Sequence, residues 1–320
     1  MEQEVLKTIK YFSFFEYSPR FEEILAFLNR QTTPNNLQKV LKSLIRQNRL
    51  SEKDNQYTLG EYSKLLSQQK TKAKISDLKI KRLATYLRFL KLFPQVRLVG
   101  LSGSVSMLNA KKDDDIDLFV ITGRNRLWTG RLICLLLASL FGRRKFRDRH
   151  TSDKICLNLF FDEGRLQIDP KKRSFYVAHE VLQMKPLIDR ENVYGRFLEA
   201  NKWVFKLFPN ATKLTVTGPV GGFLPPVLGK YPLRAVGSLH LRHPSPESAF
   251  FEHLHSKKLV YSRQRRSIIL NSIEDLIESI LKRAQLLLIN RHRTTEMITD
   301  TQLWFFPNDF EKKINSFLSL

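Results

Sequence analysis

The segment VRLVGLSGSVSMLNAKKDDDIDLFVIT, from Val96 to Thr122, decides the fold of this chain. Its apolar first part ends at Leu101, and Ser102-Gly103-Ser104 and an acidic loop follow. The second apolar run, from Ile116 to Thr122, is typical of a buried strand. The segment therefore predicts two strands that are joined by a glycine turn, a short helical segment and an acidic loop.

Two acids, Asp115 and Asp117, open the second predicted strand and are separated by one residue. Because side chains alternate between the faces of a strand, both carboxylates should project to one side while Ile116 faces the core. Mg²⁺ prefers oxygen ligands and takes one or two protein carboxylates together with the phosphates of a substrate. The sequence therefore predicts a site for Mg²⁺ or Mn²⁺ at these acids.

The glycine turn could supply the other half of a nucleotide site. Gly103 lets a ligand approach the backbone closely, and free amides with the Ser104 hydroxyl can hold phosphate oxygens. Either half alone is equally typical of an ordinary turn or of a solvated acidic loop before a buried strand. Their order and spacing together favour a nucleotide site.

This stretch resembles the signature of the nucleotidyltransferase superfamily of DNA polymerase β, a Gly-Ser turn followed at fixed spacing by two aspartates around one apolar residue. Here ten residues separate Gly103-Ser104 from Asp115-Ile116-Asp117. The resemblance implies an α+β fold with a polymerase-β-type nucleotidyltransferase core, in which helices flank a mixed sheet. It also implies that Asp115 and Asp117 bind catalytic metals, and that Gly103 and Ser104 bind the β- and γ-phosphates of a nucleoside triphosphate such as ATP.

The resemblance calls for a third carboxylate on the next strand, which we expect at residues 154–161 with 165–168 as its hairpin partner. The polar residue inside that strand is Asn158. Its carbonyl oxygen could ligate a metal, but it has no basic atom that could deprotonate a hydroxyl. Asn158 is a candidate catalytic residue, and a degenerate protein without catalysis is the alternative. Arg124 and Arg126 follow the acidic strand and are expected to bind nucleotide phosphates.

Residues 1–62 have the pattern of three helices followed by a hairpin around Asp54-Asn55. This order resembles a winged-helix domain, with residues 35–47 in the position of the recognition helix. In that position Lys39, Lys42 and Arg46 would contact nucleic-acid phosphates. Winged helices also serve as packing or protein-interaction modules, and both uses stay open.

The remaining chain is expected to flank the core. We expect a winged-helix-like domain at 1–62, a basic linker and helix start at 63–82, the nucleotidyltransferase core at 83–207, and an irregular Pro/Gly segment with a mainly helical region at 208–320. His179 and Glu180, on a predicted helix, could reach the site as acid or base or serve the core. Cys134 and Cys156 both lie in apolar runs and resemble buried small hydrophobes.

The chain carries 54 Lys and Arg against 31 Asp and Glu, a net charge of +23. Such an excess favours a polyanionic partner, RNA or DNA first and an anionic membrane second. The most apolar run, residues 132–141, is too short to span a bilayer, so membrane association is not expected. The N-terminus lacks a secretory pattern, which predicts a cytoplasmic protein.

The sequence thus predicts a metal-dependent transfer of a nucleoside monophosphate from a nucleoside triphosphate to a hydroxyl of RNA or DNA. Two alternatives remain open. The chain could be a degenerate nucleotidyltransferase-fold protein that binds nucleic acid or regulates, or it could modify a protein or a small molecule.

Overall fold

The computed structural model describes residues 1–60, 64–144, 152–211, 272–291, 296–305 and 309–319. Most of the expected irregular Pro/Gly segment lies at residues 212–271, outside these ranges. The chain divides into two compact units, Met1–Leu224 with Arg293–Leu320, and Pro225–His292. Within the second unit, residues 272–290 form a helix.

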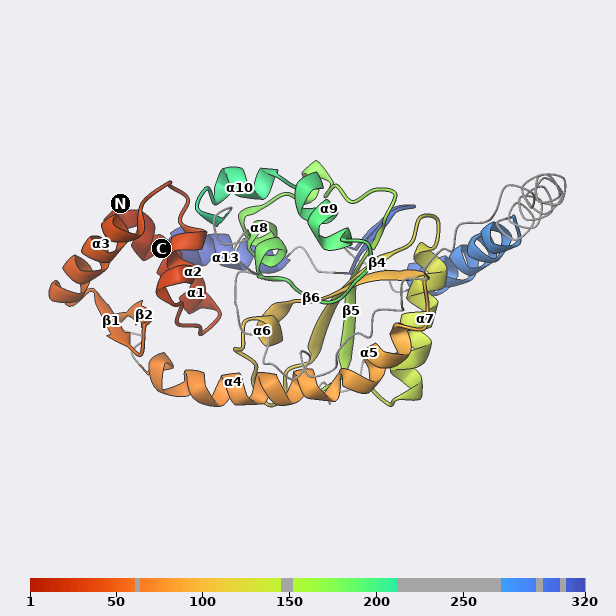
Figure 1. Ribbon diagram of the computed structural model, residues 1–320, viewed down its shortest axis with the longest axis horizontal. Helices are drawn as coiled ribbons and strands as arrows, with labels where there is room; N and C mark the ends of the chain where they lie inside the picture. The colour runs from red at the N-terminus through yellow and green to blue at the C-terminus, as the bar shows by residue number, and fades with distance from the viewer. Residues whose placement is uncertain (61–63, 145–151, 212–271, 292–295, 306–308, 320) are drawn as a thin grey trace, which may run out of the picture. The chain divides into compact units, whose positions relative to one another are not determined.

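The N-terminal part contains three helices and then an antiparallel hairpin, which confirms the predicted order (Figure 1). The elements are α1 (Glu2–Phe14), α2 (Phe21–Phe27), α3 (Pro34–Arg46), β1 (Leu50–Lys53) and β2 (Gln56–Leu59). At the start of α3, the Thr33 hydroxyl accepts the Asn36 amide at 3.3 Å. Asp54 and Asn55 both have positive φ, as a two-residue hairpin turn with right-handed strand twist requires.

The expected basic linker is a helix almost from its start. It forms α4 (Leu65–Arg82), which is followed directly by α5 (Ala84–Leu90). Gln69, Lys72, Ser76 and Lys79 are buried at helical spacing along α4. The inward face of this helix is therefore largely polar, with Ile80 as a buried apolar residue near its C-terminal end.

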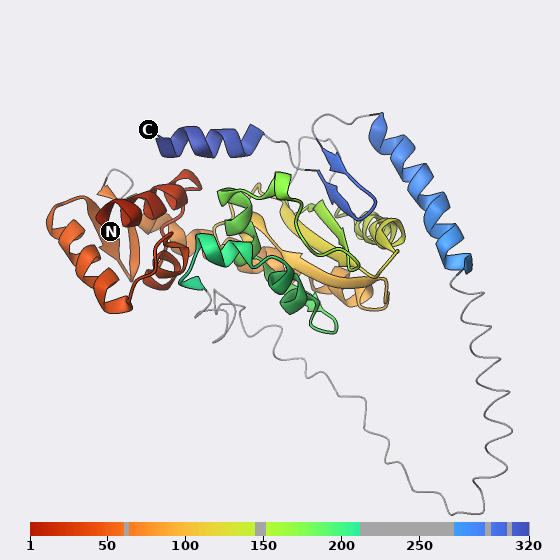
Figure 2. The ribbon, with the colours of Figure 1, turned by 90° about the horizontal axis from the view of Figure 1, so that it is seen from above.

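The main unit is built on a mixed six-stranded sheet in the order β6-β3-β4-β5-β8-β7 (Figure 2). Its strands are β3 (Val96–Leu101), β4 (Ile116–Thr122), β5 (Ile155–Asp162), β6 (Lys185–Asp189), β7 (Met297–Ile298) and β8 (Gln302–Trp304). β4 and β5 run parallel, and the other neighbouring pairs run antiparallel. The α+β class with a mixed sheet is thus as expected, and β3 and β4 match the two strands predicted from the sequence.

The prediction that residues 165–168 form a hairpin with β5 is wrong, because β5 pairs with β8 instead. Polar side chains from elsewhere bind the backbone of this segment. Gln302 donates to the carbonyls of Arg165 and Gln167, at 3.3 and 2.7 Å. Asn201 donates to the Leu166 carbonyl and accepts the Ile168 amide, each at 2.9 Å. These side chains satisfy backbone groups that a strand would otherwise have paired.

The remaining helices pack on the sheet or on other helices of the unit. They are α6 (Gly103–Ser106), α7 (Leu127–Leu140), the short 3-10 helix Pro170–Lys172, α8 (Phe175–Gln183), α9 (Val193–Ala200), α10 (Trp203–Leu207) and α13 (Asp309–Ser319). Phe119 and Ile121 of β4 share one core with α8, α9 and the N-terminal helices. Asp117, Phe119 and Ile121 are every second residue of β4, so their side chains lie on one face of the strand. The acids therefore lie on the same face of the sheet as this core.

The C-terminal region is largely helical where the structure describes it, with residues 272–290 and α13. Within the described part of the chain, every helix is too short or too polar to span a bilayer.

Candidate metal and nucleotide site

The Gly-Ser turn and the acidic strand are joined at the backbone. The Ser102 amide donates to the Asp117 carbonyl at 3.0 Å. Gly103 has φ of 64°, in the left-handed region, and a Cβ added to it would lie 2.4 Å from Oδ2 of Asp117. A glycine is therefore required here both by conformation and by the approach of the carboxylate.

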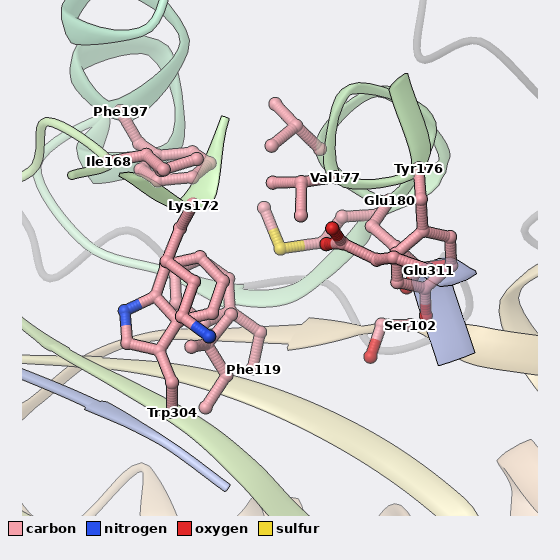
Figure 3. A pocket seen from close by; sticks show the side chains of 13 residues that line it. Ser102, Phe119, Ile168, Lys172, Tyr176, Val177, Glu180, Phe197, Trp304 and Glu311 are labelled. Carbon is pink, nitrogen blue, oxygen red and sulfur yellow. The ribbon is translucent and has the colours of Figure 1, made fainter. Parts of the chain in front are cut away.

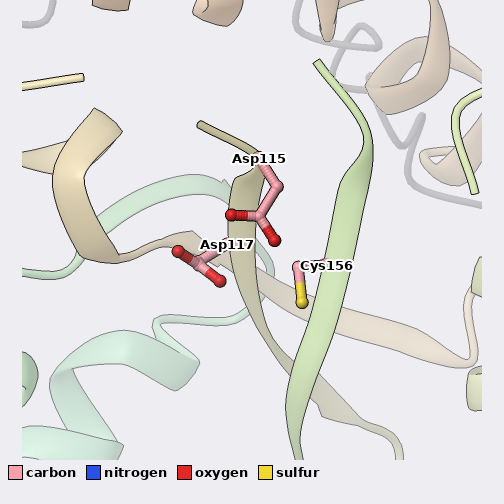
Figure 4. Close-up of side chains that lie close together, drawn as sticks. All are labelled: Asp115, Asp117 and Cys156. Atoms are coloured by element: carbon pink, nitrogen blue, oxygen red, sulfur yellow. The ribbon is translucent and has the colours of Figure 1, made fainter. Parts of the chain in front are cut away.

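Asp115 and Asp117 project to the same side, as the spacing predicts, and a thiol joins them from the neighbouring strand. One ligand atom each of Asp115, Asp117 and Cys156 lies within 4.8 Å of the others. Figure 4 shows the carboxylates of Asp115, immediately before β4, and of Asp117, within β4, beside the sulfur of Cys156 on β5. The donors could hold a divalent cation: the carboxylates suit Mg²⁺ or Mn²⁺, and a thiolate would add preference for a softer metal.

Asn158 lies in a β-bulge beside the acids. Along the parallel pair, Asp117 is opposite Cys156 and Phe119 is opposite Leu159, so Asn158 is the extra residue of β5. Its amide nitrogen donates to Oδ1 of Asp117 at 2.6 Å. Its carbonyl oxygen accepts from the Cys156 thiol at 2.7 Å. Asn158 therefore orients Asp117, as bulges near functional sites often aim a side chain.

The two cysteines differ in their surroundings. Cys134 is buried, as expected, and burial raises its pKa to about 12. The expectation that Cys156 is a buried hydrophobe is wrong, because it is half-buried among the metal-binding candidates. The missing information was the β4–β5 register, which decides that Cys156 lies opposite Asp117.

The acidic loop uses one of its aspartates to hold the turn. The Ser104 hydroxyl donates to Oδ2 of Asp114 at 2.8 Å, and the Lys111 amide donates to the same oxygen at 2.9 Å. A phosphate at Ser104 would therefore replace Asp114 as the acceptor of this hydroxyl. Asp113 is exposed in the same loop.

A buried lysine fixes the loop from below. Lys79 of α4 is 2% exposed, and its Nζ donates to the carbonyls of Lys112 and Asp114 at 2.9 and 2.7 Å. It also pairs with Oδ1 of Asp153 at 3.1 Å. The sequence predicted a basic linker and helix start here and no role for Lys79, although its helical spacing from Lys72 and Ser76 was a signal of a shared buried face.

Arg124 and Arg126 are not brought together with the acids. They follow the end of β4, whereas Asp117 lies at its beginning, and the five intervening steps rise on the order of 16 Å. Arg124 is exposed, and Nη1 of Arg126 donates to the Asn125 carbonyl at 2.7 Å.

His179 and Glu180 have different roles. His179 is fully buried, stacked against Tyr11 and Phe27 with ring centroids 3.7 and 4.6 Å apart. Burial lowers its pKa to about 3, and its Nδ1 bonds to the Phe175 carbonyl at 2.9 Å. Of the two alternatives for His179, the structure confirms the core and contradicts a place in the site. Burial raises the pKa of Glu180 to about 7, and the Gly103 amide, which donates to its carboxylate, opposes this shift.

A cavity of about 280 Å³ lies between α8 and the sheet, next to the Gly-Ser turn. Figure 3 shows Ser102, Tyr176 and Glu180 on one side of it and Phe119, Lys172 and Trp304 on the other. Because Ser102 lines the cavity and Gly103 touches both Glu180 and Asp117, cavity and acids adjoin.

The candidate nucleic-acid contacts lie away from this site on α3. Lys39, Lys42 and Arg46 are all exposed, whereas Leu37 and Leu41 of the same helix are buried. The spacing of the three basic residues gathers them on the outer side of α3.

Comparison with known proteins adds no relative: no protein-family model, no curated protein and no solved structure matches this chain.

Proposed function

We propose that this chain is a metal-dependent nucleotidyltransferase with a polymerase-β-type core. One observation carries the proposal: Asp115 and Asp117 come together where the Gly103 turn meets the acidic strand. A pair of carboxylates and a glycine turn are the parts needed to hold a divalent cation and the phosphates of a nucleotide side by side.

The donor set fits a divalent cation, which Asp115 and Asp117 would hold, with Cys156 within reach. Such a cation, Mg²⁺ or Mn²⁺, would neutralise negative charge on the phosphates of a nucleoside triphosphate. Asn158 would keep Asp117 oriented through its 2.6 Å hydrogen bond. The Gly103-Ser104 turn would contact the β- and γ-phosphates.

In the proposed reaction, an acceptor hydroxyl oxygen bonds to the α-phosphorus and the bond to the bridging oxygen of the leaving group breaks. Pyrophosphate leaves, and the acceptor keeps the nucleoside monophosphate. The hydroxyl proton passes to a carboxylate of the site or to water, because the amide of Asn158 cannot accept it.

RNA or DNA is the proposed acceptor. The helix–helix–helix–hairpin order of the N-terminal part supports a winged-helix-like module, and α3 exposes Lys39, Lys42 and Arg46. A net charge of +23 would attract either polymer. A protein or small-molecule acceptor is the competing enzymatic case.

A second candidate is a nucleotidyltransferase-fold module without catalysis that binds nucleic acid or regulates. Two positions favour it. Asn158 and Cys156, not a carboxylate, face Asp117 from β5. The module would still bind nucleic acid through α3 when the acids are replaced.

The test is transfer of label from each of the four α-labelled nucleoside triphosphates, with Mg²⁺ or Mn²⁺, to pooled RNA, DNA, protein and metabolites. We expect label on RNA or DNA with the wild type and none with Asp115→Ala/Asp117→Ala. Asp113→Ala, in the same loop but exposed, is the matched control and should transfer normally. If folded wild-type protein labels nothing yet retains RNA or DNA, catalysis is rejected in favour of the second candidate.

A further inference from the structure

The cavity between α8 and the sheet has largely aromatic and aliphatic walls. Phe119, Tyr176, Phe197 and Trp304 contribute rings from four different elements. Its volume of about 280 Å³ is just below the range of pockets for drug-sized ligands, about 300 to 1,000 Å³. Its size and walls suit a flat ligand of one or two rings, which could stack on the aromatic side chains.

The polar groups that line the cavity restrict what this ligand can be. They include two carboxylates, Glu180 and Glu311, and one amine, Lys172, whose Nζ lies 5.9 Å from the centre of the Trp304 ring. This charge balance disfavours a phosphate. The Ser174 hydroxyl donates to Glu311 at 3.0 Å, and the Gly103 amide donates to Glu180. An ionised carboxylate only accepts hydrogen bonds and has about four acceptor sites, so an alkyl chain would leave the other sites of Glu180 and Glu311 without donors from the ligand. The occupant should therefore be an aromatic ring that carries N–H groups.

The position of the cavity connects it with the acids. Phe119 follows Asp117 by two residues on the same face of β4, a rise of on the order of 7 Å. Ser102 borders the cavity immediately before Gly103. A ring in the cavity could thus be joined through a sugar to a phosphate at the acids.

We propose that this cavity binds a nucleobase, with Glu180 accepting its N–H groups. The base could belong to the nucleoside triphosphate or to the end of an acceptor strand, and both have the same chemistry. Only the choice between these two sources of the base rests on the proposed function. Binding of a free nucleoside does not, because it requires neither a metal nor nucleotidyl transfer.

The first experiment is calorimetric titration of the full chain, in EDTA, with adenosine, guanosine, cytidine and uridine separately. We expect at least one of the three amino-bearing nucleosides to bind. Glu180→Gln should weaken that binding by about tenfold or more, because it places an N–H group where the ligand offers its own. Glu199→Gln, exposed on α9, is the matched control and should bind as the wild type does.

A second variant tests the cavity independently of charge. Val177→Phe extends a ring into the lined space and should abolish nucleoside binding, while circular dichroism reports whether the fold is kept. The proposal is overturned if no nucleoside binds folded wild type, if binding survives both Glu180→Gln and Val177→Phe, or if decanol binds this cavity and nucleosides do not.

Competition identifies the source of the base. If a nucleoside triphosphate with Mg²⁺ displaces the bound nucleoside, and does so less well in Asp115→Asn/Asp117→Asn, the cavity binds the base of the nucleotide donor. If a single-stranded oligonucleotide displaces the nucleoside equally in both proteins, the cavity binds a base of the acceptor strand. Displacement by neither contradicts the inference. Failure of label transfer with intact nucleoside binding would reject the proposed function alone.

Discussion

Cys156 lies directly opposite Asp117 in the parallel pair of β4 and β5, and its sulfur can approach the same point as the carboxylates of Asp115 and Asp117. Two hard oxygen donors and one soft sulfur donor form a mixed set. Such a set favours transition metals, and a coordinating thiol loses its proton.

We expect Co²⁺ titrated into the wild type to produce the near-ultraviolet charge-transfer absorption of a cobalt–thiolate bond. Cys156→Ser should remove this absorption, because a hydroxyl is not a sulfur donor. Cys134→Ser should keep it, since Cys134 is buried and burial raises its pKa to about 12. Absorption that survives in Cys156→Ser would show that the thiol is not a ligand.

Replacement of Gly103 should disturb Asp117. In Gly103→Ala the new Cβ meets a left-handed φ and the Asp117 carboxylate, so we expect a loss of more than about 1 kcal/mol in the free energy of unfolding. Gly142→Ala is a matched control, because Gly142 has φ of 62° but no atom within 4 Å of an added Cβ. Urea unfolding measures both.

The same pair of variants separates backbone strain from damage to the site. Divalent cations should raise the melting temperature of wild type and Gly142→Ala but not of Gly103→Ala, because only the latter displaces Asp117. Equal losses of stability and equal metal responses in the two variants would contradict the role assigned to this contact.

The buried amine of Lys79 should be needed to hold the acidic loop. Lys79→Met removes the charged donor to the carbonyls of Lys112 and Asp114, which keep only the Ser152 hydroxyl and the Asp153 amide as donors. We therefore expect a loss of about 1–3 kcal/mol in unfolding free energy. Lys74→Met, exposed on the same helix, should change it by less than about 0.5 kcal/mol. Chemical denaturation compares them, and an equal effect of both changes would argue against the loop contact.

Glu180 should make the fold less stable as pH rises. Its pKa is raised from 4.5 to about 7, so the folded protein keeps a proton that the unfolded chain loses. This contribution to stability is complete below about pH 4.5 and disappears as pH rises through about 7. Glu180→Gln should remove this decline in metal-free urea unfolding. The raised pKa of Glu180 would be contradicted if the difference in unfolding free energy between wild type and Glu180→Gln did not change between about pH 4.5 and pH 7.

His179 should act in the opposite direction. Its pKa is lowered from 6.5 to about 3, so the folded protein excludes a proton that the unfolded chain binds. The corresponding stability is present above about pH 6.5 and is lost as pH falls towards 3. In His179→Phe, the free energy of unfolding measured with urea should decrease less on acidification than it does in the wild type. If the free energy of unfolding decreased equally on acidification in both proteins, the decrease would come from groups other than His179.

Local pattern was sufficient for part of the site. The placement of Asp115 and Asp117 on one side of a strand follows from an alternation of two residues, and the glycine turn follows from composition. Both are properties of consecutive residues, which the chain carries without reference to any distant segment. The same holds for the order of three helices and a hairpin at the N-terminus.

Contacts between distant segments could not be obtained in this way. The burial of Lys79 depends on α4 passing beneath a loop more than thirty residues away, and β5 takes as its partner β8 from near the C-terminus. His179 enters an aromatic core that α1 and α2 complete. Each of these positions is decided by which surface packs against it, and helical or strand periodicity does not encode that choice.

The sequence by itself therefore determined the two strands, the glycine turn and the paired carboxylates, because backbone geometry sets the direction of neighbouring side chains. Only the tertiary structure decided that Cys156 and Asn158 face Asp117 and that Glu180 reaches Gly103. Strand register, a bulge and the packing of α8 on the sheet set these distances, and all three arise when segments far apart in the chain bury their surfaces together.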